Sequence, residues 1–256
     1  MADLPARRFR ARDGVELAWR EVGDGRPVVL LHGLMGTGTL MASDGPARAI
    51  AARGYRVILP DLRGHGDSGR PHDPACYPPD VLADDGLALV DHLGLGDYHL
   101  AGYSLGGKVV LRLLARGARP ARAVVGGQGL DALDAQSSRT GGYRRVLAAI
   151  ADGGAFEPGS PEEGLAGWVK QIGADPRAID YVIGSSVATP PDALRQVPVP
   201  TLIVAGDRDS RSESAAELAA LLPNGQVVLV PGDHETTLSA PEFTAAVLDF
   251  LARAAG

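Results

Sequence analysis

A serine lies between two glycines at the point where an apolar, strand-like segment meets a helix-like segment. Residues 102–106 read Gly-Tyr-Ser-Leu-Gly. When a strand turns this sharply into a helix, the middle side chain is lifted above the sheet, and the glycines relieve crowding in the strained backbone. The motif therefore predicts a strand–turn–helix unit that presents Ser104 as a candidate nucleophile.

The residues on either side of the motif support this prediction. Residues 98–101 have strand character after a turn at 94–97, and residues 108–116 carry apolar side chains at helical spacing before Gly117. Because the chain holds 34 glycines, the five residues alone would also fit a Gly-Ser loop that enters a helix and has no chemistry. The order of strand, tight turn and helix favours the nucleophile.

Short runs rich in Val, Ile and Leu alternate with helix-like stretches along the chain. This alternation is typical of an α/β fold with a mostly parallel sheet and helices on both faces, because parallel strands need crossover connections. We expect central strands at residues 27–31, 55–59, 98–103, 121–125, 201–205 and 226–230, and helices at 39–53, 80–93, 105–116, 212–222 and 241–254. Residues 7–11 and 15–21, joined by Asp13-Gly14, predict an antiparallel hairpin at one edge. Pro241 suits a first helical turn, with Ser239 as its cap.

The pattern changes between residues 130 and 196, where Gly, Pro and charged residues surround helix-like pieces with no obvious strand. A stretch of this length is too long for a simple loop. We therefore expect one α/β core, residues 1–129 and 197–256, and a small helical cap inserted at residues 130–196. The apolar cap residues that could line a pocket, or equally form the cap's own core, are Phe156, Trp168, Ile172, Tyr181, Val182 and Ile183.

A serine hydroxyl needs a base near neutral pH, and the base needs an acid that fixes its tautomer. Of the six histidines, His234 follows the last expected strand through a short loop, so it lies where strand ends meet the active edge of an open α/β sheet. Asp209 follows the strand at 201–205 and is preferred as the acid over Asp207, which could cap its own turn. The resulting order of Ser, Asp and His is the one expected when a nucleophile elbow begins the set.

Acyl transfer also needs donors for the oxyanion. One is expected to be the backbone N–H of Leu105, directly after the serine. The second is expected from the glycine-rich loop after the strand at 27–31, where the N–H of Leu34 could point to the same place. His32 in that loop is expected to form hydrogen bonds to the backbone and hold the loop in place, rather than to transfer a proton.

Composition excludes several other classes of function. A net charge of −6 without a long Lys/Arg run argues against nucleic-acid binding. No apolar stretch approaches the roughly 18 residues of a membrane span, and the first residues lack the apolar region of a signal peptide, so we expect a cytoplasmic protein without membrane contact. The single cysteine, Cys76, has no activating neighbour, and no metal or nucleotide motif is present, so we expect neither a metal nor a cofactor.

Five motifs in order resemble the α/β-hydrolase superfamily, and the resemblance runs almost end to end. They are His-Gly-Leu-Met-Gly at 32–36, Asp-Leu-Arg-Gly-His-Gly-Asp-Ser at 61–68, Gly-Tyr-Ser-Leu-Gly-Gly at 102–107, Ala-Gly-Asp-Arg-Asp at 205–209 and Gly-Asp-His at 232–234. The resemblance implies a catalytic triad of Ser104, Asp209 and His234, with Leu34 and Leu105 N–H groups as the oxyanion hole. It also implies a structural role for 61–68, with His65 buried.

The function that follows is that of a serine hydrolase acting on a small to medium ester or lactone through an acyl-enzyme. The same triad could serve a carbon–carbon bond hydrolase, a thioesterase, a peptidase or a cofactor-free perhydrolase, or the chain could be a non-enzymatic ligand receptor on a hydrolase fold. A serine at the elbow argues against dehalogenase and epoxide hydrolase chemistry, which relatives of this fold perform with aspartate. Asp131, after the strand at 121–125, remains a reserve acid.

Overall fold

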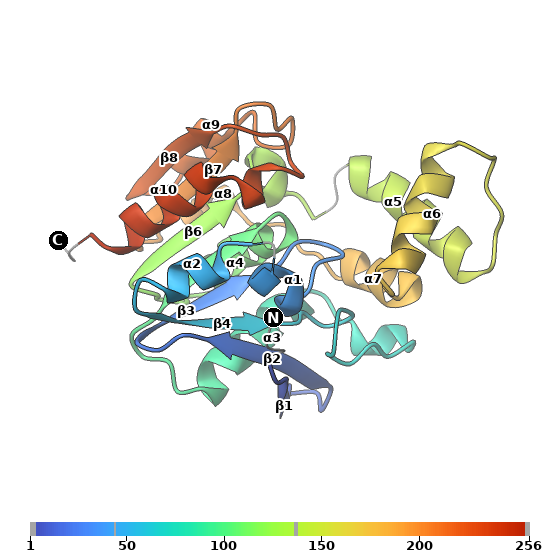
Figure 1. Ribbon diagram of the computed structural model, residues 1–256, viewed down its shortest axis with the longest axis horizontal. Helices are drawn as coiled ribbons and strands as arrows, with labels where there is room; N and C mark the ends of the chain where they lie inside the picture. Colours follow the sequence, from blue (N-terminus) through green and yellow to red (C-terminus); the bar gives the residue numbers. More distant parts are fainter. Residues whose placement is uncertain (1–3, 44, 136–137, 254–256) are drawn as a thin grey trace.

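The computed structural model describes residues 4–43, 45–135 and 138–253, and is built around one eight-stranded sheet (Figure 1). The strands follow the order β1-β2-β4-β3-β5-β6-β7-β8. Their bounds are β1 Arg7–Arg10, β2 Glu16–Val22, β3 Arg26–Leu31, β4 Tyr55–Pro60, β5 His99–Tyr103, β6 Arg122–Gly126, β7 Thr201–Gly206 and β8 Gly225–Val230. From β4 to β8 neighbouring strands are parallel, whereas β1 and β2 form the expected antiparallel hairpin at one edge. The α/β-hydrolase fold class predicted from the sequence is confirmed.

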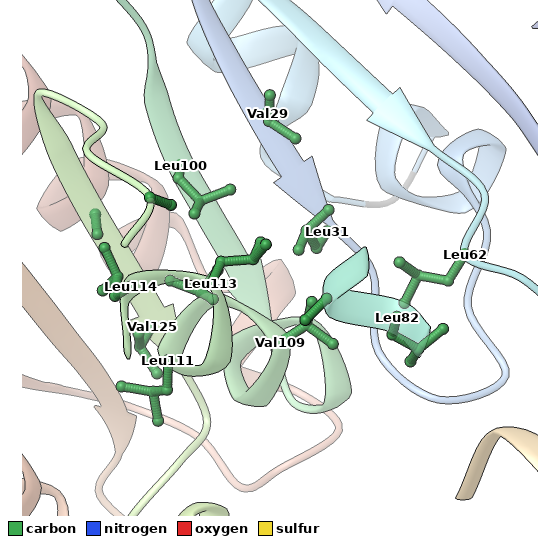
Figure 2. Close-up of a cluster of buried hydrophobic side chains, with 14 of the residues drawn as sticks. Val29, Leu31, Leu62, Leu82, Leu100, Val109, Leu111, Leu113, Leu114 and Val125 are labelled. Carbon is green, nitrogen blue, oxygen red and sulfur yellow. The ribbon is translucent and has the colours of Figure 1, made fainter. Parts of the chain in front are cut away.

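Helices cover both faces of this sheet. The main helices are α1 Gly38–Ser43, α2 Ala47–Ala51, α3 Val81–His92, α4 Leu105–Ala115, α9 Ala215–Ala220 and α10 Pro241–Leu251, with short 3-10 helices η1 Pro74–Cys76 and η3 Thr237–Ser239. Alternate residues of the central strands supply two separate cores. Val29, Leu100 and Val125 share one core with side chains of α3, α4 and α9, and Figure 2 shows the part of this core around Leu82 of α3 and Val109 to Leu114 of α4. Val28 and Val124 pack against α1, α2 and α10. Because the central strands are covered on both faces, their sequences are nearly continuous apolar runs.

Three expected elements differ in the structure. The single helix expected at 39–53 is two helices, because Pro46 precedes α2 and disfavours helical backbone at Gly45. Ala240, not Ser239, is the N-cap of α10, and Pro241 lies in its first turn as expected. The strand at 226–230, expected to be central, lies at the edge as β8.

The segment between β6 and β7 is helical. It contains η2 Leu130–Leu133, α5 Ser138–Ala151, α6 Pro161–Gln171, α7 Pro176–Gly184 and α8 Pro191–Leu194. Side chains of Ser160 and Asp175 accept hydrogen bonds at the first turns of α6 and α7, which explains where these helices begin. Figure 1 shows α5 and α6 projecting beside the main body. We refer to α5, α6 and α7 as the helical insertion.

The helical insertion has a small apolar core of its own. Leu147, Val169, Ile179 and Ile183 are buried together, and Met35 from the loop after β3 joins them. The insertion therefore packs onto the same loop that carries Leu34. Among the described helices, none is long and apolar enough to cross a membrane.

A buried arginine ties the hairpin edge to the rest of the fold. The side chain of Arg63 is 1% exposed and donates hydrogen bonds to both carboxylate oxygens of Asp85 on α3, at 2.8 and 2.9 Å. It also binds Asp13 in the hairpin turn and the carbonyl of Cys76. Because a buried guanidinium is stable only when its donors are satisfied, these three segments are held together at one point.

We expect Arg63→Met to lower the free energy of unfolding by about 3 kcal/mol, because it leaves the Asp85 carboxylate buried without its partner. Denaturant unfolding of the two proteins measures this loss. Arg8→Met is the matched control, since Arg8 pairs with Glu16 at the surface and its loss should cost less than about 1 kcal/mol. Equal losses for both variants would contradict the proposed role of Arg63.

Candidate active site

Ser104 occupies the sharp turn between β5 and α4. Its backbone has φ 54° and ψ −117°, and residues other than glycine rarely adopt a positive φ. A Cβ on Gly102 would lie 2.4 Å from the backbone of Gly106, and one on Gly106 would lie 2.3 Å from the carbonyl oxygen of Leu31. Both glycines are therefore required by close backbone packing, as the motif predicts.

Two further side chains form a hydrogen-bonded chain with Ser104. The Nε2 atom of His234 lies 2.9 Å from the Oγ of Ser104, and its Nδ1 lies 2.8 Å from the Oδ2 of Asp209. The three residues come from loops that follow β5, β7 and β8, whose carboxyl ends meet at one edge of the sheet. The structure thus brings together the three residues that the sequence selected.

Asp209 is buried and remains a carboxylate. Burial alone would raise its pKa, but hydrogen bonds from His234 and from the backbone N–H of Arg211, at 2.9 Å, hold the pKa below its usual value. A charged acceptor next to Nδ1 fixes the proton on that nitrogen and leaves Nε2 free to accept one from the serine.

The other two carboxylates considered from the sequence lie elsewhere. Asp207 accepts a hydrogen bond from the N–H of Gly232 at 2.9 Å, so it joins the loop after β7 to the loop after β8. Asp131 is exposed on η2. Of the three candidate acids, Asp209 is the one in contact with His234.

The loop that carries His234 is fixed at several points. Asp233 accepts hydrogen bonds from the N–H and hydroxyl of Thr236, and its carbonyl accepts one from the hydroxyl of Thr237. The hydroxyl of Tyr103 donates to the carbonyl of His234 at 2.6 Å, and the two rings lie 5.4 Å apart. Tyr103 is the last residue of β5 and directly precedes Ser104. Neighbouring residues therefore position His234 and present the candidate nucleophile.

The loop after β3 lies directly beside Ser104. A Cβ on Gly33 would be 3.3 Å from the Cβ of Ser104. The N–H of Gly36 donates to the carbonyl of Gly33 at 2.9 Å, which closes a tight turn with Leu34 and Met35 at its centre, and Met35 has a positive φ of 64°. On the other side of the serine, the N–H of Leu105 opens α4, where backbone donors have no acceptor within the helix.

The buried His32 supports this loop, and the ring of the buried His65 lies beside it, with the ring centroids 4.9 Å apart. Nε2 of His32 accepts the N–H of Leu62 at 2.9 Å, so its Nδ1 carries the proton and donates to the carbonyl of Gly33 at 2.8 Å. Burial lowers the pKa of His32, and it lowers the pKa of His65 to about 3, with the nearby ring of His32 as a smaller cause. Both rings are neutral near pH 7, and the holding role expected for His32 matches its hydrogen bonds.

Sequence reasoning missed two residues that support the site. Tyr103 holds the His234 loop, and the side-chain amide of Gln128 donates to the carbonyl of Ser104 at 2.5 Å. Gln128 lies in the glycine-rich segment 126–129, at the end of β6. Neither residue belongs to a recognisable sequence motif, so only the fold shows which carbonyl each one binds.

Two basic residues on α4 are already paired. Lys108 donates to the carbonyls of Asp134 and Ala135, and burial lowers its pKa. Arg112 forms an ion pair with Asp80. Within the described part of the chain, no group of three or more His, Cys, Asp or Glu side chains could hold a metal ion.

A cleft of about 280 Å³ separates the helical insertion from the core. Its walls include Met35, Thr37 and His65 on the core side, and Ile172 and Ile179 on the insertion. Ser104 does not line this cleft. Of the apolar residues that could have lined a pocket, Val182 and Ile183 are buried in hydrophobic cores, and Trp168 is 43% exposed.

Comparison with known proteins relates this chain to a family with the same fold. The family described as the alpha/beta hydrolase fold matches residues 26–131. A non-heme haloperoxidase from Rhodococcus erythropolis is 32% identical over 276 residues, covering 94% of this chain and 97% of its own.

Solved structures give the same picture. A thermophilic esterase from Thermogutta terrifontis superposes with a TM-score of 0.77 at 25% identity, covering 96% of this chain and 98% of the other. A bromoperoxidase from Bacillus anthracis superposes with a TM-score of 0.75 at 28% identity, covering 96% and 100%. The similarity therefore extends over the core and the helical insertion.

We expect Tyr103→Phe to slow the labelling of Ser104 by a serine-directed phosphonate about fivefold, because one neutral hydrogen bond to the His234 loop is worth about 1 kcal/mol. The labelling rate, followed by intact-protein mass spectrometry, measures this effect. Tyr55→Phe is the control, since Tyr55 begins β4 at the opposite end of the sheet. An unchanged rate in Tyr103→Phe would show that the hydroxyl does not position His234.

Proposed function

Because this chain belongs to the α/β-hydrolase superfamily, we propose that it is a serine hydrolase that cleaves a small to medium ester or lactone. The observation that carries the proposal is the continuous hydrogen-bonded chain from Ser104 through His234 to Asp209. An ester-type substrate agrees with the esterase among its structural neighbours. The proposed substrate is a small molecule, with neither nucleic acid nor a membrane as partner.

In the first half of the reaction, the Oγ of Ser104 attacks the substrate carbonyl carbon while Nε2 of His234 takes the hydroxyl proton. The tetrahedral intermediate collapses when the imidazolium gives this proton to the leaving alkoxide, and an acyl-serine and an alcohol result. In the second half, water attacks the acyl carbon with the same histidine as base. The acid product leaves and Ser104 regains its proton.

The negative oxygen of each tetrahedral intermediate is assigned to the N–H groups of Leu34 and Leu105. Gly33 lies against Ser104, so the turn that holds Leu34 is next to the reacting carbon. Preorganised donors of this kind contribute about 3 kcal/mol each to transition-state stabilisation. His32 supports the first donor indirectly, through its hydrogen bond to the carbonyl of Gly33.

The helical insertion is proposed to act as a cap over this site, within the residue range 130–196. It packs on Met35, next to the proposed oxyanion donor, and Arg70 and His72 of the core contact the insertion at Gly173 and Asp175. A cap that packs on the loop beside the serine can limit the size of the acyl or alcohol group. Acyl-chain preference is therefore expected to depend on the insertion.

We expect the wild type to hydrolyse p-nitrophenyl esters, with a preference across graded acyl lengths. Ser104→Ala should lower turnover by about 10⁶-fold, because the nucleophile is absent. Asp209→Asn should lower it by about 10⁴-fold, because an amide no longer holds the proton of His234 on Nδ1. The rate of p-nitrophenol release from esters of different acyl length measures the turnover of all three proteins.

Asp131→Asn is the matched control for the acid and should keep wild-type turnover. Loss of turnover in Asp131→Asn alone would contradict the assignment of Asp209. If the wild type hydrolyses no ester but Ser104 still reacts with a phosphonate, the nucleophile is active and the substrate class is wrong. Absence of both reactions would favour a non-enzymatic ligand receptor.

Perhydrolysis is a second candidate function, favoured by the relative named a non-heme haloperoxidase. In this reaction hydrogen peroxide replaces water as the acceptor of the acyl group, and the peracid product oxidises a halide in solution. We expect bromination of monochlorodimedone to require both peroxide and a carboxylic acid, and to disappear in Ser104→Ala. Bromination that persists in Ser104→Ala would contradict an acyl-serine route.

A further inference from the structure

The two edges of the sheet are chemically different. β1, at one edge, carries Arg7, Arg8 and Arg10, all exposed. β8, at the other edge, reads Gly-Gln-Val-Val-Leu-Val and holds no charged residue, no proline and no bulge. Natural proteins protect an exposed edge with charge, proline or a bulge, because unpaired backbone groups otherwise recruit another strand. β1 has such protection and β8 has none.

Large apolar side chains are exposed along β8. Val227 is 38% exposed, Val228 36% and Leu229 66%, which makes three consecutive members of the small set of exposed large apolar residues in the described chain. They lie on both faces of the strand, because neighbouring residues point in opposite directions. The apolar surface therefore wraps around the edge and does not belong to one face alone.

The backbone of β8 has a free side with a definite pattern. Carbonyls of Asn224 and Val230 accept hydrogen bonds from Thr201 and Asp207, in and just after β7, so even-numbered residues face the sheet. Alternation turns the N–H and C=O groups of Val227 and Leu229, and the C=O of Gly225, outward. The N–H of Gly225 donates to the carbonyl of Leu222 at 3.0 Å and is not available to another strand. Among the described residues, no other strand pairs with this side.

We propose that β8 pairs with β8 of a second copy of this chain, in antiparallel orientation about a two-fold axis at Val227. In this register Val227 faces its own counterpart, and Gly225 faces Leu229 of the other copy. Every outward N–H then meets an outward C=O, which no register shifted by one residue allows. The paired strands join two eight-stranded sheets into one continuous sheet.

A second copy fits this edge better than a different partner because the edge can pair with itself. In an antiparallel pair about Val227, the free N–H groups of Val227 and Leu229 meet the C=O groups of Val227 and Gly225 of the other copy, and the contact uses the same residues on both copies. The strand carries no charge, so two copies meet without repulsion, whereas two β1 edges would oppose arginines. Val227 packs against its counterpart, and Leu229 packs diagonally against Val227 of the other copy, which covers apolar groups that the monomer exposes.

This pairing does not depend on the proposed function, but it adjoins the site. β8 runs directly into residues 231–234, which deliver His234. Asp207 joins the ends of β7 and β8 through Gly232. A paired β8 therefore stabilises the strand from which the histidine loop emerges.

The test is the molecular mass in solution, measured by multi-angle light scattering over a range of concentrations. We expect the wild type to have the mass of two chains. Val227→Lys should have half that mass, because two ammonium groups would face each other at the axis. Leu229→Pro should also be monomeric, since proline removes an outward N–H but leaves the hydrogen bonds to β7 intact.

Leu40→Lys is the matched control, because Leu40 is 42% exposed on α1, away from β8, and this variant should remain a dimer. A wild type that is monomeric at every concentration would overturn the proposal. So would a folded Val227→Lys or Leu229→Pro that keeps the mass of two chains.

A measurement on the wild type alone guards against variants that fail to fold. Amide hydrogen exchange in the peptide that spans β8 should slow as protein concentration rises, because pairing protects the outward N–H groups. Exchange that is independent of concentration would likewise overturn the proposal.

Discussion

The close packing of backbone around Ser104 is the constraint on which the site depends. The turn holds a non-glycine residue at positive φ, and this strain persists because β5, α4 and the loop after β3 approach at distances that no Cβ would permit at Gly102 or Gly106. The same approach brings Gly33 against the serine. Nucleophile and proposed oxyanion donors are therefore positioned by one packing arrangement.

Around this turn, polar side chains fix the loops that the parallel sheet brings together. His32 links the loop after β3 to Leu62, Asp207 links the loop after β7 to the loop after β8, and Tyr103 links β5 to His234. Each contact joins segments far apart in sequence. His32 and Tyr103 are buried, and leaving either group unpaired would cost more than its hydrogen bond contributes, so these contacts make the geometry of the site specific.

The two edge strands, β1 and β8, both have an unpaired backbone side, but their side chains differ in charge. Arginines make the β1 edge unsuitable for self-association, whereas β8 holds no charged residue and exposes apolar side chains. Because β8 also leads to His234, a contact at that edge lies one short loop from the chemistry. The assembly and the site are thus neighbours in the fold, although they use different residues.

The sequence by itself determined the fold class and pointed to Ser104 at the elbow and to His234, while Asp209 was its preferred acid and Asp131 its reserve. It could do so because strand hydrophobicity and the glycine requirements of tight turns are local properties. The tertiary structure decided between Asp209 and Asp131 as the neighbour of His234, and it revealed Tyr103 and Gln128 as supports of the site. It also placed the strand at 226–230 at the edge of the sheet. These outcomes depend on which segments meet in space, and a side chain's partner across the sheet leaves no periodicity in its own sequence.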